Sequence, residues 1–322
     1  MNENRYHFPK KLKTAVKGAG SAFLLVLFAG CGSGENASSG SRPLIVVTHS
    51  VLGAVVSEVA GEAAEVVVLV PNGIDPHDWE PSAKDIETVN NADLVVANGL
   101  HLEARLEEVL DNASSSGVRV FEATDHVTIL EFADHAKEEA GEHSDEEKSG
   151  DEHAEGDPHF WTDAAAMAQV VEALGDQLFD LGIDIGDRAG MTAERLVTLD
   201  NDLRQEAESL TSEQRVLVTG HESMGYFANR YDFTLIGAVI PSLTTQSEVS
   251  AGAIASLKEQ VTEAGVNVIF NELGTPAKTV EAIAAETGAK VVEISTHVLP
   301  EDGRYETFMR DLMRAIVEAL KS

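Results

Sequence analysis

Short apolar runs rich in valine, isoleucine and leucine alternate with helical patterns along most of the chain. Four runs lie in the first half and four in the second: 44–47, 66–70, 94–97, 118–121, 216–218, 235–240, 266–270 and 291–294. Continuous apolar strands separated by helices are typical of parallel sheets, whose strands are buried on both faces. The pattern therefore predicts an α/β protein with two lobes, each built on a four-stranded parallel sheet.

A long helical pattern lies between the two sets of strands. Its leucines recur at helical spacing, with no proline or glycine among them: Leu196, Leu199, Leu203 and Leu210. The spacing predicts a helix within 186–211 that joins an amino-terminal lobe, 43–185, to a carboxyl-terminal lobe, 212–322. A long rigid helix in this place restricts hinge closure between the lobes. The alternative is that the helix belongs to one lobe only.

The amino terminus has the pattern of an export signal. Five basic residues precede an apolar run at 22–29, which Gly30 and Cys31 follow. We therefore expect a signal peptide at 1–30, because the run is shorter than the roughly 20 residues that span a bilayer. Cys31 is the single cysteine of the chain.

The surroundings of Cys31 resemble a bacterial lipobox, which predicts that this residue is lipidated and that 31–42, rich in glycine and serine, is a flexible tether. The protein would then be extracytoplasmic and anchored by lipid to the cell membrane, at the cell surface or on the periplasmic face. The alternative is a stray cysteine in an ordinary signal peptide.

Charge restricts the possible partners. The 322 residues include 55 acidic and 23 basic side chains, a formal net charge of −32 with histidine neutral. Such a surface repels phosphate backbones and attracts cations, which argues against nucleic-acid binding. Solubility alone is an alternative explanation for most of these carboxylates.

The segment 131–157 is dominated by carboxylates and has hardly any large apolar residue. It cannot form a core and is predicted to be disordered. The histidines within it, His135, His143 and His153, suggest a loop that gathers metal with low affinity. A solvated acidic insertion with incidental histidines is the alternative.

Three short segments each place a histidine after residues that favour a turn. They are Asp-Pro-His at 75–77, Asp-Pro-His at 157–159 and Thr-Gly-His at 219–221. A proline restricts the backbone before the next residue, and neutral imidazole is the commonest protein ligand for zinc-like ions. We therefore expect one metal site built from loops that are far apart in sequence. Ser82 and Asp85 are placed to cap the helix after the first segment.

With these motifs, the chain resembles the solute-binding lipoproteins of bacterial zinc and manganese ABC importers, the cluster 9 (A-I) binding proteins. The resemblance covers nearly all of 43–320 and is most specific at 75–85, 157–161 and 221–231. It implies that three histidines are metal ligands: His77, His159 and His221. It also implies that the metal lies in the cleft between two α/β lobes joined by a long helix.

The fourth ligand departs from this family's pattern. The family usually supplies an aspartate after the last strand, and alignment on Ile294-Ser295-Thr296 places His297 there. Glu272, Asp302 or a water molecule are the alternatives. Glu222 and Glu248 are expected near the cleft as hydrogen-bond partners of ligand rings. His49 is expected to pack nearby, while Trp79 and Trp161 are expected to exclude water from the site.

Metal type follows from the ligands. Three or four imidazoles suit zinc, whereas manganese prefers more carboxylate and water oxygen. The resemblance implies a monomeric binding protein that captures Zn²⁺ outside the membrane and passes it to an ABC permease. Alternatives are a manganese-binding (Mn²⁺) member of the family and a metal-binding adhesion lipoprotein at the surface.

A zinc hydrolase is the main alternative from another class of protein. It would need an open coordination position and a general base, for which Glu222 is the single candidate. No His-Glu-x-x-His, Gly-x-Ser-x-Gly or Walker motif occurs in the sequence. We therefore predict a binding protein and not an enzyme.

Overall fold

The computed structural model describes residues 42–131 and 156–322. Ser41–Ser322 form one compact unit. The predicted signal peptide, Cys31, most of the predicted tether and the loop histidines His135, His143 and His153 lie outside the described residues. Within the described part of the chain, no helix is both long enough and apolar enough to cross a bilayer.

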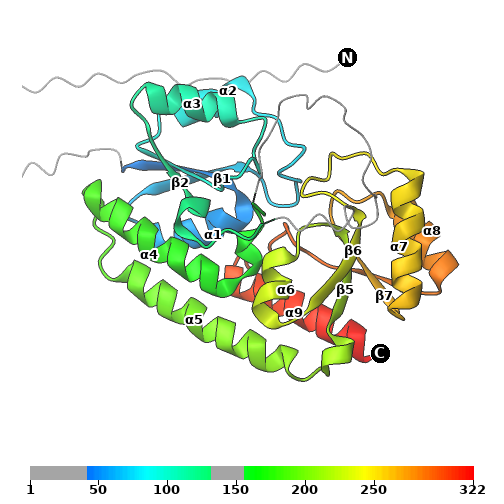
Figure 1. Cartoon of the computed structure of the whole chain (residues 1–322). Helices are drawn as coiled ribbons and strands as arrows, with labels where there is room; N and C mark the ends of the chain where they lie inside the picture. The colour runs from blue at the N-terminus through cyan, green and yellow to red at the C-terminus, as the bar shows by residue number, and fades with distance from the viewer. Residues whose placement is uncertain (1–41, 132–155) are drawn as a thin grey trace, which may run out of the picture. The chain divides into compact units, whose positions relative to one another are not determined.

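The first half is a parallel four-stranded sheet in the order β2-β1-β3-β4 (Figure 1). Its elements are β1 (Leu44–His49), α1 (Ser50–Ala60), β2 (Glu65–Val70), α2 (Ala83–Asn90), β3 (Leu94–Ala97), α3 (Glu107–Ser115), β4 (Arg119–Glu122) and the short 3-10 helix η1 (Ala123–His126). Ile45 and Val47 pack in one buried cluster and Val46 in another, because successive side chains of a strand point to opposite faces. Burial on both faces explains the continuous apolar runs.

The second half contains two parallel strand pairs, β5–β6 and β7–β8, where the sequence predicted a single four-stranded sheet. Its elements are η3 (Ser212–Gln214), β5 (Val216–His221), α6 (Gly225–Tyr231), β6 (Thr234–Ile240), α7 (Ala251–Glu263), β7 (Val268–Asn271), α8 (Ala277–Thr287) and β8 (Lys290–Glu293). The two pairs lie side by side and share a core. At the carboxyl end of β5, His221 pairs with Ile240 of β6, and its amide donates to the Glu272 carboxylate.

Three long helices complete the fold, two between the halves in the chain and one at its end. They are α4 (Ala164–Asp180), α5 (Arg188–Ala207) and α9 (Tyr305–Lys321). Helix α5 falls within the predicted range 186–211, and it packs on α4 and α1 as well as on α9 and α6 (Figure 1). Leu196, Leu199 and Leu203 are buried in a core cluster that includes residues of both halves. The helix is therefore packed along much of its length, and the division into separate lobes remains a prediction.

The predicted disordered segment is too wide at both ends. Glu131 and Gly156 form an antiparallel bridge, and Asp157 is buried. Asp157 belongs to the Asp-Pro-His motif, whose fixed turn extends order into this acidic stretch. The residues between these ends, 132–155, lie outside the described part of the chain.

Candidate metal centre

Four histidines from different loops converge at one point. His77 follows β2, His159 precedes the short 3-10 helix η2 (Phe160–Thr162), His221 ends β5, and His297 follows β8. One ring nitrogen from each lies within 4.8 Å of the others. All four residues are buried, and His77 is the most exposed, at 9%. The structure thus brings together the three motif histidines and His297.

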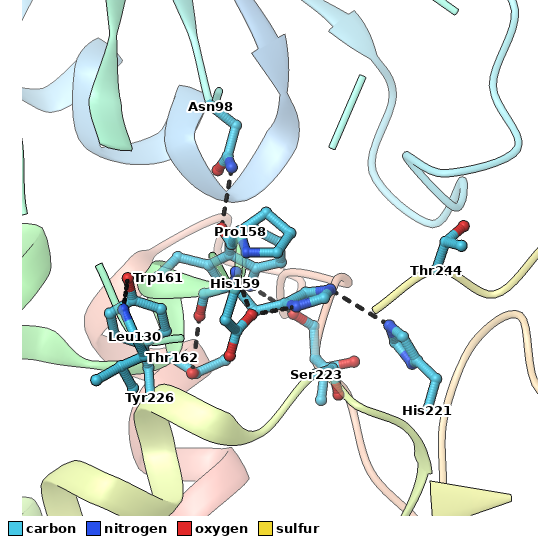
Figure 2. A network of polar contacts seen from close by, with 12 residues as sticks. Asn98, Leu130, Pro158, His159, Trp161, Thr162, His221, Ser223, Tyr226 and Thr244 are labelled. Atoms are coloured by element: carbon cyan, nitrogen blue, oxygen red, sulfur yellow. Dashed lines mark hydrogen bonds and ion pairs between the residues drawn. The ribbon is translucent and has the colours of Figure 1, made fainter. Parts of the chain in front are cut away.

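The spacing of the ring nitrogens fits a small tetrahedral ion. Nε2 of His159 lies 3.2 Å from Nε2 of His77. It lies 3.3 Å from Nε2 of His221, the contact drawn in Figure 2. Zinc binds imidazole nitrogen at about 2.0–2.1 Å, which puts two tetrahedral ligands roughly 3.3–3.4 Å apart. The ring of His297 lies slightly further out, with centroids 5.5–5.9 Å from the other three rings. Its buried Nε2 has no hydrogen-bond partner among the described residues.

Asp157 fixes the orientation of His159. Its Oδ1 lies 2.7 Å from the ring Nδ1 and also accepts the backbone N–H of His159 at 2.9 Å. Because Nδ1–H donates to the carboxylate, the lone pair of Nε2 is left facing the site. Asn98 adds a second restraint, since its Nδ2 donates to the Pro158 carbonyl (Figure 2).

The first Asp-Pro-His segment repeats this backbone arrangement. Asp75 Oδ1 accepts the N–H of His77 at 2.9 Å, the same two-residue turn that Asp157 makes with His159. The other oxygen of Asp75 accepts Thr245 Oγ1 at 2.7 Å and so ties this loop to the second half. The predicted Ser82–Asp85 capping box is present at the start of α2. The repeated motif therefore has one physical role, which is to position a histidine after a turn.

Glu272 lies behind His221 and outside the set of four converging nitrogens. Its side chain is fully buried, and Oε1 accepts the N–H of His221 at 3.0 Å. Oε2 accepts the hydroxyls of Ser223 at 2.7 Å and Thr296 at 2.6 Å. Both oxygens thus lie on the side of His221 away from Nε2, the ring nitrogen that converges with the other histidines. The structure places Glu272 as a partner of a candidate ligand, and it does not support the alternative that Glu272 is itself the ligand.

The other acidic candidates lie elsewhere. Asp302 is exposed and accepts hydrogen bonds from Arg304 and Thr307 at the start of α9. Glu248 is exposed before α7. Glu222 is buried, and burial followed by the charge of Asp157 raises its pKa to about 7. Among the described contacts, neither Glu222 nor Glu248 bonds to a ligand ring. The carboxylates beside these rings are Asp157, which accepts from His159 Nδ1, and Glu272, which lies within ion-pair distance of His221 Nδ1.

Trp161 forms one wall of the site. It is fully buried, with its ring 5.2 Å from that of His159 and 5.5 Å from that of His297. Its Nε1 donates to the Thr296 carbonyl at 2.8 Å, which anchors the His297 loop. His49 packs against Trp161, and burial lowers its pKa to about 4. Trp79 packs instead on the core between β1 and the α2–α3 layer, so it does not wall the site as expected.

Sequence reasoning missed Asn98 and Thr296. Asn98 immediately follows strand β3, and its Oδ1 lies 3.2 Å from His49 Nε2. A polar residue directly after a buried parallel strand lies at the edge where the other strands also end, and this signal could have identified it. Thr296 was used to align the final loop, but nothing in its type predicts its contact with Glu272.

The protonation of the rings predicts how metal affinity depends on pH. Burial, and then the charges of neighbouring rings, lower the pKa of His77 and His297. Burial also acts to lower the pKa of His221, but the combined effect of Glu272, Asp75 and Asp157 raises it above 6.5. A raised pKa means that a proton competes with the metal for His221 up to a higher pH.

We therefore expect zinc affinity to be constant above the pKa of His221 and to fall by about tenfold for each pH unit below it. Competition titrations with a zinc-binding dye between pH 5.5 and 8.5 would measure this. An affinity that does not change across that range would contradict the assignment of His221 as a ligand.

Gly225 gives a prediction about the restraint on His159. A Cβ at Gly225 would lie 2.4 Å from Asp157 Oδ2, so alanine would displace the carboxylate. Loss of such a partner typically weakens metal binding by about 10- to 100-fold, and we expect that effect for Gly225→Ala. The matched control is Gly252→Ala in α7, where the nearest atom is 3.7 Å away. Zinc affinity should be unchanged in the control; equal affinities in both variants would contradict this role of Asp157.

The parallel α/β fold and the buried cluster of imidazoles define a metal-binding protein. Residues 45–319 match the family described as zinc-uptake complex component A, periplasmic (ZnuA), and the chain belongs to this family. The predicted α/β class and the predicted resemblance are therefore confirmed. The family is periplasmic, and its members are components of metal transport.

Individual relatives agree with this assignment. The chain is 29% identical over 300 residues to the zinc-binding protein TroA of Treponema pallidum (strain Nichols), covering 89% of this chain and 91% of the relative. It is 27% identical over 306 residues to the manganese-binding lipoprotein MntA of Halalkalibacterium halodurans, covering 93% and 95%. The solved structure of the periplasmic zinc-binding protein TroA from Treponema pallidum matches with a TM-score of 0.73 and 27% identity, covering 87% of this chain and 99% of that one.

Proposed function

We propose that this chain is the extracytoplasmic zinc-binding component of an ABC importer. It takes Zn²⁺ into a site formed by His77, His159, His221 and His297, and it delivers the ion to a membrane permease as a monomer. The observation that carries the proposal is the set of four buried ring nitrogens that lie within 4.8 Å of one another. Membership of a zinc-uptake family supports the same function.

The choice of zinc over manganese rests on donor chemistry. The converging atoms are all imidazole nitrogens, and the nearest buried carboxylates, Asp157 and Glu272, are engaged with ring Nδ1 or backbone groups. Imidazole suits zinc, whereas manganese prefers carboxylate and water oxygen. Manganese remains the second candidate because one relative is named as a manganese-binding lipoprotein.

The same geometry argues against a zinc hydrolase. A catalytic zinc keeps one coordination position open for water, whereas four protein ligands close the shell of a tetrahedral ion. With His297 as the fourth ligand, no position is left for a reacting water. Glu222, the candidate base, makes no hydrogen bond to a candidate ligand ring among the described residues. A binding protein that performs no reaction is the function these residues support.

Two parts of the proposal concern residues of this chain that the structure does not describe. Lipidation of Cys31 would hold the protein at the membrane, and a relative named as a lipoprotein supports this. The acidic segment with His135, His143 and His153 would gather metal with low affinity and would not form the tight site. Both can be tested separately from the four-histidine site.

Calorimetric titration of the mature chain with zinc and with manganese tests the proposal. We expect one tight zinc equivalent, weaker manganese binding, and loss of the tight site in the His77→Ala, His159→Ala double variant. Replacement of 132–155 by a glycine-serine linker of about four residues leaves room for the Glu131–Gly156 bridge and keeps Asp157, so the tight site should survive it. Preferential manganese binding would overturn the metal assignment, and absence of any tight site would overturn the function.

A further inference from the structure

We propose that Glu272 is a positioning residue that sets two of the four metal ligands, His221 by direct contact and His297 through the hydroxyl of Thr296. This inference rests on the proposed function, because it concerns how the same site is held ready for metal. It assigns to Glu272 and Thr296 a role in zinc affinity that goes beyond filling the core.

The argument starts from the buried contacts of the carboxylate. Glu272 Oε1 accepts the backbone N–H of His221 and lies 3.3 Å from its ring Nδ1, within ion-pair distance. Gly220 makes this approach possible, because a Cβ there would lie 2.7 Å from Glu272 Cγ. The glycine of the Thr-Gly-His motif therefore has a physical reason. The nearby carboxylate favours the His221 tautomer with hydrogen on Nδ1 and a free lone pair on Nε2.

The second ligand is set through Thr296. Thr296 Oγ1 lies 2.6 Å from Glu272 Oε2 and 2.8 Å from His297 Nδ1. A hydroxyl has one hydrogen, and an ionised carboxylate can only accept, so the Thr296 hydroxyl donates to Glu272. The hydroxyl oxygen must then accept from His297 Nδ1–H. In a neutral ring this leaves the proton off Nε2, the buried atom for which the described part of the chain supplies no hydrogen-bond partner.

The contacts of the carboxylate give this direction. Oε1 accepts the backbone N–H of His221 and Oε2 accepts the Thr296 hydroxyl, so both oxygens of Glu272 act as acceptors. The Ser223 hydroxyl also donates to Oε2, and no contact of Ser223 with a ligand ring is present among the described residues.

Replacing Glu272 with glutamine is expected to reverse the direction of the hydrogen bonds that run from His297 through Thr296 to residue 272. The N–H of His221 needs an acceptor, so the amide oxygen must occupy the position of Oε1 and the NH₂ group that of Oε2. The NH₂ group would then donate to Thr296, whose hydroxyl would turn to donate to His297 Nδ1. A neutral His297 ring would carry its proton on Nε2 and could not bind metal.

Zinc affinity and the visible spectrum of the Co²⁺-loaded mature chain test this. We expect Glu272→Gln and Thr296→Val to weaken zinc binding by about 10- to 100-fold, the range seen when partners of metal ligands are removed. Both Co²⁺ spectra should shift towards that of His297→Ala, whereas Thr296→Ser, which restores the hydroxyl, should recover the wild-type spectrum. Thr198→Val is the matched control, since Thr198 is exposed on α5 and its hydroxyl donates to the Glu194 carbonyl of the same helix.

The outcomes separate a positioning role from a structural one. If Glu272→Gln and Thr296→Val lower the melting temperature of the metal-free chain but keep the wild-type Co²⁺ spectrum and zinc affinity, the inference is overturned. Should Glu272→Gln fail to fold, the comparison of Thr296→Val with Thr296→Ser decides alone. A wild-type chain that binds neither ion would overturn the proposed function itself and is thus a distinct result.

Discussion

Replacing His159 with alanine is expected to weaken zinc binding by more than about 100-fold, since removal of a ligand exceeds the loss seen for its partners. His159 is fully buried, and its Nε2 is the atom closest to both His77 and His221. Without this ring, only three of the four converging ring nitrogens remain, and the one adjacent to both His77 and His221 is lost. Competition with a chelator of known affinity would measure the loss.

His126→Ala is the matched control for this variant. His126 is exposed and stacks on Phe121, away from the converging rings. Its replacement should leave zinc affinity unchanged. If His159→Ala bound zinc as tightly as the control, the ion would have to be held by other residues of the chain, and the four-histidine site would be wrong.

Trp161→Ala is expected to lower the free energy of unfolding of the metal-free chain by about 3–5 kcal/mol, the usual cost of truncating a buried tryptophan. The ring of Trp161 is fully buried, and its Nε1 donates to the Thr296 carbonyl. The hydroxyl of Tyr305 donates to the backbone carbonyl of Trp161. The variant leaves a cavity beside the rings of His159 and His297. Urea denaturation followed by circular dichroism would measure the change.

Phe179→Ala is the aromatic control for that measurement. Phe179 is 80% exposed, and a surface substitution of this kind changes stability by no more than about 0.5 kcal/mol. A loss below about 1 kcal/mol for Trp161→Ala would show that the ring does not support the packing around the site.

The histidines could be identified from sequence because their local context is strong. Asp75 and Asp157 each accept the N–H of the histidine two residues later, so the short Asp-Pro-His motif is enough to predict a local turn. His297 has no such turn, and its selection depended on alignment with the family's last ligand. The structure brings it into the cluster with the other three.

The partners of the ligands were harder to predict. Glu222 is adjacent to His221 in sequence and was the expected partner, but Glu272, which follows β7, holds that position. Contacts of this kind depend on which loops meet at the ends of neighbouring strands. Asn98 and Thr296 were missed for the same reason. Asn98 donates to the Pro158 carbonyl, far away in sequence, and Thr296 links His297 to Glu272.

The strand runs predicted the α/β class because burial on both faces leaves a continuous apolar signal. They did not predict that β5–β6 and β7–β8 form separate pairs, because apolar runs show which strands are buried and do not show which strands are hydrogen-bonded to each other. Helix α5 was predicted from its leucines, but its packing against both halves was not. Periodicity shows that a helix has an apolar face, and the partners of that face depend on tertiary structure.

X-ray absorption at the zinc edge of the zinc-loaded mature chain tests the central claim most directly. The account predicts four nitrogen neighbours at about 2.0–2.1 Å, with the outer scattering of imidazole rings. A shell dominated by oxygen, or a six-coordinate ion with at most two imidazoles, would contradict a zinc site formed by His77, His159, His221 and His297.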